Sequence, residues 1–129
     1  MMVLLVEDGL SERLFASHFL NRMGCEVIVA ENGLEALAII SHEPVDLVIL
    51  DLCMPVLDGV EMIKRIRAGD GETRNAQVRI VVWSVAEDKL EEALNAGADD
   101  ALLKSCEPSL LRQCIEKHHV KARQGAASE

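Results

Sequence analysis

Aromatic side chains are nearly absent from this chain: among 129 residues there are two phenylalanines, one tryptophan and no tyrosine. Half of the residues are nevertheless hydrophobic, so the core must be built from Val, Leu, Ile and Ala. A chain of this length is expected to form one domain and to bury about two-thirds of the surface that it exposes when unfolded. The sequence therefore predicts a single domain with an aliphatic core.

Basic residues are also scarce. The chain has 13 Lys and Arg against 22 Asp and Glu, a net charge of -9. A nucleic-acid surface needs clustered Lys and Arg, so we expect no nucleic-acid partner. No hydrophobic run approaches the ~18 residues of a membrane span, and no charged leader precedes a signal-like segment. We therefore expect no membrane contact and a cytoplasmic location.

The cysteines lack the usual metal-site spacing. There is no C-x-x-C pair and no histidine at zinc-site spacing from a cysteine, so we expect reduced thiols at Cys25, Cys53, Cys106 and Cys114. Cys53 is expected to be a packed thiol and not a redox sensor. The four histidines are expected to fill surface or core positions.

Strands and helices are expected to alternate strictly. Short apolar runs predict strands at Met2–Val6, Glu26–Ala30, Val45–Leu50, Arg79–Trp83 and Asp100–Leu103. Helical spacing and capping residues predict helices over Ser11–Met23 with Ser11 as N-cap, from Leu34 to the break at Pro44, from Asp58 as N-cap to about Ala68, over Lys89–Ala96, and from Pro108. Gly69–Gln77 is polar and is expected to be an exposed loop.

Five successive strand–helix units predict an α/β fold with a doubly wound, five-stranded parallel sheet and helices on both faces. The domain is expected to span residues 1–120, followed by a short polar tail over 121–129. Ligands of such sheets bind at the carboxyl ends of the strands. Any functional site should therefore lie at that edge.

Three carboxylates stand at two of these strand ends. Glu7 and Asp8 follow the first strand, and Asp51 follows the third. If the two strands are parallel neighbours, the side chains converge, and like charges repel unless a hard divalent cation lies between them. The sequence thus predicts a Mg²⁺ site beside an aspartate.

Two more strand ends carry polar groups. Ser84 follows the fourth strand, and Lys104 follows the fifth. Around a central aspartate they would supply a hydroxyl and a cation for the oxygens of a tetrahedral anion, which are the groups that phosphoryl transfer requires.

The motifs that carry these groups resemble a known family. Four segments contribute: V-E-D at 6–8, D-x-x-M-P-x-x-D-G at 51–59, Ser84 after an apolar strand, and A-G-A-D-D-A-L-L-K at 96–104. Together they resemble the receiver domain of two-component response regulators, over residues 2 to about 119. The resemblance implies a flavodoxin-like fold with strand order 2-1-3-4-5.

By this resemblance Asp51 is the phosphoacceptor, a carboxylate nucleophile that attacks a phosphohistidine and forms an acyl phosphate. Ser84 and Lys104 would hold the phosphoryl oxygens.

The resemblance also implies a set of Mg²⁺ ligands. Asp8 and Asp51 would bind the ion directly, Glu7 would act through water, and Cys53 would contribute its backbone carbonyl.

Three positions depart from the family pattern. Ala101 stands where most members carry Tyr or Phe, so the usual aromatic switch is missing. Ser105 replaces the proline that usually follows the lysine, and we expect an altered loop after the fifth strand. Val85 replaces a small residue and is expected to narrow access to the phosphoryl site.

The preferred interpretation is a non-enzymatic signalling module. A histidine kinase or histidine phosphotransfer protein would phosphorylate Asp51, and the output would pass through a downstream partner protein, with the chain a monomer or weak dimer. The module is expected to carry no output domain; it is either free-standing or a receiver from a hybrid kinase. The first alternative is a phosphorylation-independent interaction module. A phosphatase-type or flavin-binding enzyme is a weaker one, because there is no second aspartate two residues after Asp51 and no phosphate-binding loop after the first strand.

Overall fold

The computed structural model describes residues 1–69 and 76–127, with side chains described through residue 119. Its single sheet is parallel and has the order β2-β1-β3-β4-β5, which confirms the predicted fold class. The strands are β1 (Met2–Val6), β2 (Glu26–Ala30), β3 (Leu47–Leu50), β4 (Arg79–Ser84) and β5 (Asp100–Leu103).

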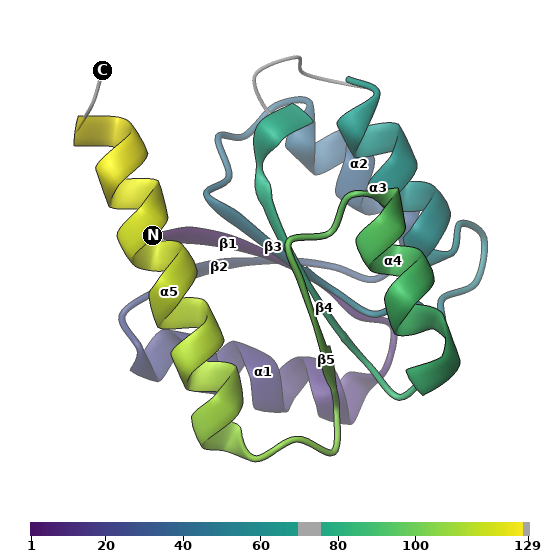
Figure 1. Cartoon of the computed structure of the whole chain (residues 1–129), viewed down its shortest axis with the longest axis horizontal. Coiled ribbons are helices and arrows are strands. Elements are labelled where there is room, and N and C mark those ends of the chain that lie inside the picture. Colours follow the sequence, from purple (N-terminus) through teal and green to yellow (C-terminus); the bar gives the residue numbers. More distant parts are fainter. Residues whose placement is uncertain (70–75, 128–129) are drawn as a thin grey trace.

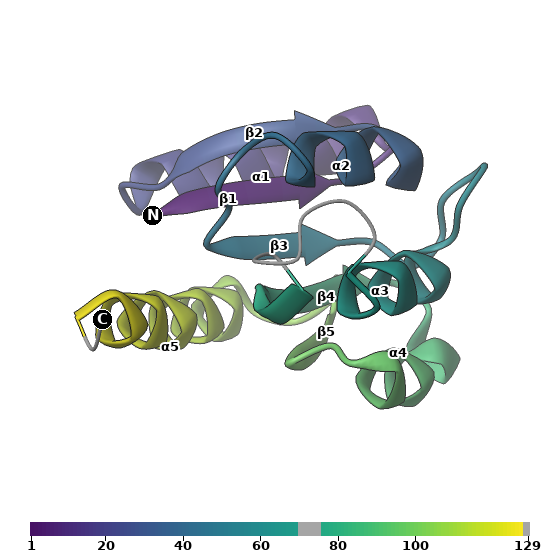
Figure 2. The same ribbon diagram turned by 90° about the horizontal axis from the view of Figure 1, so that it is seen from above.

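Helices cover both faces of the sheet (Figures 1 and 2). They are α1 (Leu10–Arg22), α2 (Gly33–Ile40), α3 (Gly59–Arg67), α4 (Leu90–Ala96) and α5 (Pro108–Ala127), with a 3-10 turn, η2 (Glu87–Lys89), before α4. Buried residues of α1 and α5 pack on one face, and those of α2, α3 and α4 pack on the other. The central strands β1, β3 and β4 are buried on both faces, as expected of a parallel sheet between two helix layers.

Capping residues account for two of the helix starts. The Asp58 side chain accepts a hydrogen bond from the Glu61 backbone N–H at 2.9 Å, which confirms its predicted role as N-cap. Asn32 caps α2 in the same way. The predicted cap at Ser11 is wrong: α1 begins at Leu10 after Gly9, which has extended backbone and no side chain to offer.

Other element boundaries differ by a few residues. β3 begins at Leu47 and not at Val45, and β4 continues through Ser84. α5 continues to Ala127, past residue 120 where the sequence suggested the start of a tail. Most of the loop predicted over Gly69–Gln77 lies outside the described residues. No helix in the described ranges is long and apolar enough to cross a membrane.

The strand register brings the predicted site residues to one edge. Val6 pairs with both Ala30 and Leu50, and Ser84 pairs with Leu103. Because all the strands point the same way, the residues that follow them emerge at the same edge of the sheet.

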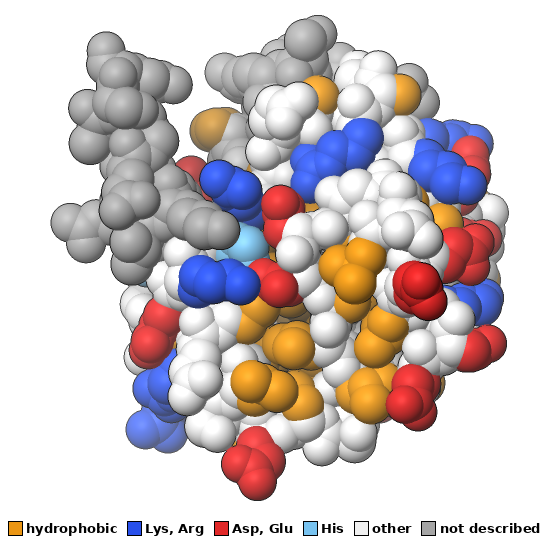
Figure 3. Space-filling view, viewed as in Figure 1, with side chains coloured by type: hydrophobic (Ala, Val, Ile, Leu, Met, Phe, Trp, Pro, Cys, Tyr) orange, Lys and Arg blue, Asp and Glu red, His pale blue; other side chains and the backbone are white. Residues whose placement is uncertain are grey.

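Hydrophobic side chains also gather on the surface over β5, between α4 and α5 (Figure 3). Every residue of β5 is only partly buried, and Leu94 and Leu110 of the flanking helices are 44% and 46% exposed. This edge strand therefore presents an apolar surface on the molecule.

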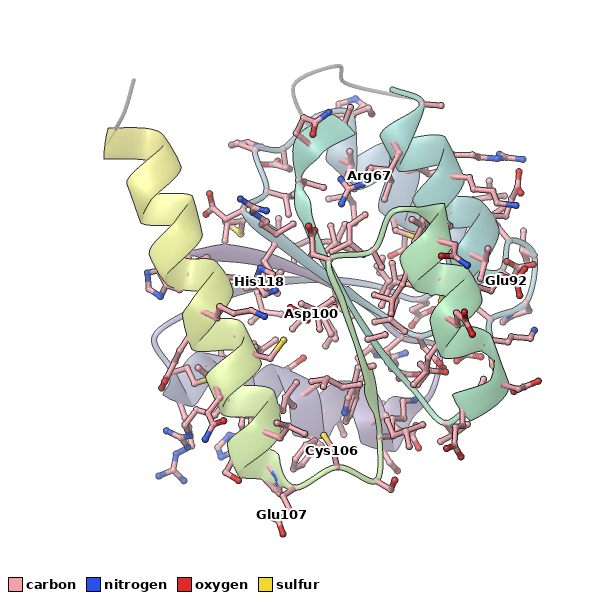
Figure 4. The ribbon with its side chains drawn as sticks, viewed as in Figure 1. Arg67, Glu92, Asp100, Cys106, Glu107 and His118 are labelled. Carbon is pink, nitrogen blue, oxygen red and sulfur yellow. The ribbon has the colours of Figure 1, made fainter. Side chains whose placement is uncertain are left out.

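Arg67, at the end of α3, holds the amino end of β4 in place (labelled in Figure 4). Its guanidinium donates to the backbone carbonyls of Gly97, Ala76 and Val78 at 2.9, 2.8 and 2.6 Å, and to Asp99 at 3.1 Å. One side chain thus satisfies three half-buried carbonyl groups.

We predict that Arg67→Gln lowers the free energy of unfolding by about 2 to 4 kcal/mol, because half-buried acceptors lose a charged donor. Arg65→Gln is the matched control. Arg65 is 41% exposed and pairs with Glu61 on the same helix, at 3.6 Å, so its loss should cost less than about 0.5 kcal/mol. Chemical denaturation of both variants measures the difference; equal effects would contradict the assigned role of Arg67.

Candidate functional site

Three carboxylates meet at the carboxyl edge of β1 and β3. Carboxylate oxygens of Glu7, Asp8 and Asp51 all lie within 4.8 Å of one another. Glu7 and Asp51 are buried, at 1% and 5% exposure, whereas Asp8 faces solvent. The convergence predicted from the strand ends is therefore present in the structure.

Lys104, which follows β5, reaches across β4 into this cluster. Its Nζ lies 2.5 Å from Glu7 Oε1 and 3.4 Å from Asp51 Oδ2. Burial raises the pKa of Glu7 above its ordinary value, and the contact with Lys104 only partly offsets this. Burial alone would lower the pKa of Lys104. The hydrogen bond to Glu7 and the charge of Asp51 raise it by more, so the pKa of Lys104 lies above its ordinary value. Lys104 therefore stays charged and offsets part of the repulsion between the two carboxylates.

Backbone groups fix the two buried carboxylates. The Gly9 N–H donates to Glu7 Oε2 at 3.0 Å, and the Cys53 N–H donates to Asp51 Oδ1 at 3.3 Å. The guanidinium of Arg13 donates to the backbone carbonyls of Glu7 and Asp8 at 3.3 and 3.5 Å. The turn after β1 is thus held from the first helix, an interaction that the sequence reading missed.

Ser84 is the last residue of β4 and is buried between the ends of β3 and β5. Its hydroxyl accepts a hydrogen bond from the Ala86 N–H at 3.2 Å, and its carbonyl accepts one from the Lys104 N–H at 2.9 Å. The second bond joins the ends of β4 and β5, so the positions of Ser84 and Lys104 are linked.

The loop over 51–59 turns sharply away from Asp51. A Cβ at Gly59 would lie 2.6 Å from the Asp51 carbonyl oxygen, so only glycine fits there. Val56 has a φ of 73°, a left-handed conformation that costs a β-branched residue about 1 to 2 kcal/mol. This strain is stored five residues after the central aspartate.

A cavity of about 340 Å³ opens beside Lys104, lined by Ser11, Glu12, Phe15, Trp83, Val85 and Lys104. The Lys104 ammonium lies 5.2 Å from the centre of the Trp83 ring, and this ring stacks on Phe15 with 6.1 Å between centroids. Trp83 was not singled out from the sequence. The parallel register offered a signal, because it places Trp83 beside Leu102, two residues before the lysine.

The thiol predictions are partly wrong. All four cysteines are free, as expected, but Cys53 is exposed and not packed, although its neighbours Leu52 and Met54 are buried. At the family's aromatic position, Ala101 is partly buried against the core beneath α4.

The side chains of Glu7, Asp8 and Asp51 fit a hard divalent cation. They offer only oxygen donors, and two of them are withdrawn from water close to each other, which is the arrangement that Mg²⁺ or Ca²⁺ stabilises. The ammonium of Lys104 contacts Glu7 and Asp51, whereas Asp8 faces solvent. A metal ion could therefore enter the cluster from the side of Asp8.

A parallel sheet of order 2-1-3-4-5, with acidic residues and a lysine at its carboxyl edge, defines the flavodoxin-like class of doubly wound domains. Within that class, residues 3–116 match the family model for the response regulator receiver domain. The chain belongs to this family, whose members are signalling modules of two-component and phosphorelay systems and bind Mg²⁺ in their active site.

Individual relatives agree with this assignment. The chain is 31% identical to sporulation initiation phosphotransferase F of Bacillus subtilis, over 90% of this chain and 91% of the relative. It is 32% identical to the sensor protein GacS of Pseudomonas syringae, over 98% of this chain but only 14% of that protein. The receiver domain of the sensor histidine kinase PA1611 from Pseudomonas aeruginosa, solved with a magnesium ion in its active-site cleft, superposes with a TM-score of 0.81 at 25% identity, over 90% of this chain and 94% of that one.

Removing one charge from the cluster should stabilise the metal-free protein. Two carboxylates ~5 Å apart repel by about 3 kcal/mol at an effective dielectric constant near 20, before the offset from Lys104. We predict that Asp51→Asn raises the free energy of unfolding in EDTA by about 1 to 2 kcal/mol, a gain of several degrees in Tm. Mg²⁺ should raise the Tm of the parent more than that of the variant, because the variant has lost one of the three carboxylates.

Thermal melts in EDTA and in ~10 mM Mg²⁺, chosen for a weak all-oxygen site, measure both effects. The control is Asp88→Asn, since Asp88 is exposed in η2 and its loss should change stability by less than about 0.5 kcal/mol. A lower Tm for Asp51→Asn in EDTA would mean that the three carboxylates do not act as one cluster.

Proposed function

We propose that this chain is a phosphoacceptor module in which Asp51 receives a phosphoryl group from a phosphohistidine. The observation that carries the proposal is the convergence of Glu7, Asp8 and Asp51 with the ammonium of Lys104 within a few ångströms. A buried carboxylate beside a fixed cation and a proposed metal position is the arrangement that a carboxylate nucleophile needs.

In this reaction a carboxylate oxygen of Asp51 attacks the phosphorus atom. The bond from phosphorus to the imidazole nitrogen of the donor breaks, the nitrogen takes back the electron pair, and an acyl phosphate forms on Asp51. Lys104 would then exchange its contact with Asp51 for one with a phosphoryl oxygen, while its contact with Glu7 holds it in place. The Ser84 hydroxyl is proposed to donate to a second phosphoryl oxygen.

Mg²⁺, when bound, would neutralise negative charge on the carboxylates and on the incoming phosphoryl group. Its proposed ligands are the side chains of Asp8 and Asp51 and the backbone carbonyl of Cys53, with Glu7 acting through water. The all-oxygen character of the three carboxylates supports this choice, as does the magnesium described for the PA1611 receiver domain.

The proposed phosphodonor is a histidine kinase or a histidine phosphotransfer protein, and the proposed output is a change in the affinity of a partner protein. The chain matches a segment that makes up 14% of the length of GacS, and it matches nearly all of sporulation initiation phosphotransferase F. These matches are consistent with a receiver inside a hybrid kinase and with a receiver that stands alone.

The first test is direct phosphorylation. With acetyl phosphate or phosphoramidate and Mg²⁺, the intact mass should rise by one phosphate, about 80 Da, and Asp51→Asn should abolish the gain because the nucleophile is gone. Omitting Mg²⁺ should also abolish it. Asp46→Asn is the control: Asp51 is unchanged in this variant, so the variant should still be labelled. A phosphate on any other residue would contradict the assignment.

Val85 is expected to limit the rate of this labelling. It lines the cavity beside Lys104 and is 69% exposed, and we propose that a phosphodonor approaches Asp51 past its β-branched side chain. Val85→Ala should therefore increase the labelling rate several-fold. Leu94→Ala, on α4 and outside that cavity, should leave the rate unchanged; equal rates for the parent and Val85→Ala would remove Val85 from the access path.

A second candidate is a phosphorylation-independent interaction module. The apolar surface over β5 between α4 and α5 favours it (Figure 3), together with Ala101, which has no ring to signal phosphorylation. A chain that takes up no phosphate in the mass experiment, yet is stabilised by Mg²⁺, would favour this candidate.

A further inference from the structure

A second group of metal-ligating side chains lies between β5 and α5, at the amino end of β5. Ligand atoms of Asp100, Cys114 and His118 all lie within 4.8 Å of one another. Cys114 and His118 are one helical turn apart on α5 and face Asp100 across the interface; Asp100 and His118 point toward each other in Figure 4. None of these residues belongs to the cluster around Asp51.

The three side chains are held firmly. His118 is 1% exposed and Cys114 is 8% exposed. His118 Nε2 lies 2.6 Å from Asp100 Oδ2, and Lys117 Nζ lies 2.9 Å from the same oxygen. The other ring nitrogen of His118, Nδ1, is buried with no hydrogen-bond partner among the described residues, so the contact of Nε2 with Asp100 orients the ring.

We propose that Asp100, Cys114 and His118 form a binding site for a borderline-soft divalent metal of the zinc class. A thiolate, an imidazole and a carboxylate are the ligand types that Zn²⁺ prefers, whereas Mg²⁺ prefers oxygen alone. Tetrahedral Zn²⁺ holds its ligand atoms about 3.5 Å apart, given bond lengths of about 2.0 to 2.3 Å, so the three groups need only small side-chain rotations.

The fourth ligand would be water. A cavity of about 250 Å³ borders Asp100 and Cys114 and is also lined by Leu102, Leu110, Gln113 and Lys117. This opening gives the metal an entry path and leaves one coordination position accessible to solvent, as in zinc sites with three protein ligands.

Binding would require three changes in the protein. The metal would replace the hydrogen bond between His118 Nε2 and Asp100, and the proton of the neutral imidazole would lie on Nδ1. The Cys114 thiol would lose its proton to solvent as the sulfur–metal bond forms, with no change in oxidation state. Burial and the nearby Asp100 raise the pKa of Cys114 to about 11, so the thiol is protonated until a metal displaces that proton. The Lys117 ammonium would also leave Asp100; its side chain is 51% exposed and can turn into solvent.

The test uses the full chain in excess Mg²⁺, which occupies the all-oxygen cluster, and titrates it with Co²⁺ and then with Zn²⁺. One equivalent of Co²⁺ should produce thiolate-to-metal charge-transfer absorption, and Zn²⁺ should abolish that absorption by displacing the Co²⁺. Cys114→Ser should remove the charge-transfer band and weaken Zn²⁺ binding at least about tenfold, since it removes the thiolate ligand. Cys106→Ser and Asp51→Asn are controls in which both signals should persist.

Lys117→Gln gives a second variant whose effect has the opposite sign. It removes the cation that competes for Asp100 and alters a half-exposed side chain, so the fold should not be affected. Zn²⁺ should bind this variant about two- to fivefold more tightly than the parent, the range expected from losing one partly exposed ion pair. A purely structural Asp100–Lys117 pair would give no such gain.

Three results would overturn the proposal. These are the absence of a charge-transfer band in the parent, a band that survives Cys114→Ser but is lost in Cys106→Ser, and Zn²⁺ binding that disappears only in Asp51→Asn. If Cys114→Ser fails to fold in a thermal melt, the sign of the Lys117→Gln effect decides alone: tighter binding supports the site, and unchanged or weaker binding refutes it.

Discussion

The parallel register of β1 with β3 is the constraint on which the molecule depends. Pairing Val6 with Leu50 aligns the buried ends of two strands, so the residues that follow them, Glu7 and Asp51, must emerge side by side. A slip of one residue would turn every side chain of β1 to the opposite face and separate both cores from their helices. The hydrophobic pattern that fixes the register therefore also sets the spacing of the carboxylates.

The cost of that arrangement is electrostatic. Two carboxylates buried next to each other favour any cation that can reach them, and Lys104 reaches them from the end of β5, which is separated from β1 by β3 and β4. The Lys104 N–H is also bonded to the Ser84 carbonyl, so the residue that carries the ammonium is anchored to the end of β4. The charged cluster is thus joined to the end of the edge strand β5, next to the apolar surface between α4 and α5.

Much of this could be predicted from the sequence, because apolar runs ending on polar residues report strand ends directly. The five strands, the carboxylate cluster and the Asp58 cap follow from such local signals, whereas the strand order was implied only by the resemblance to the receiver family. Ser11 was misjudged as a cap because Gly9, which has no side chain, starts the helix two residues earlier. The exposure of Cys53 depends on the turn of the loop after Asp51, and the Asp100–Cys114–His118 cluster depends on how α5 lies across β5; neither is encoded in spacing along the chain alone.

The stack of Trp83 on Phe15, beneath the ammonium of Lys104, has an optical consequence. Trp83 is the only tryptophan, and the chain has no tyrosine, so its near-ultraviolet emission comes from one indole that lies 5.2 Å from the Lys104 charge. A ligand that draws the ammonium away from the ring alters the electric field at the indole and hence the intensity of its emission. The protein thus carries a built-in, label-free fluorophore at the site where an anion would be held.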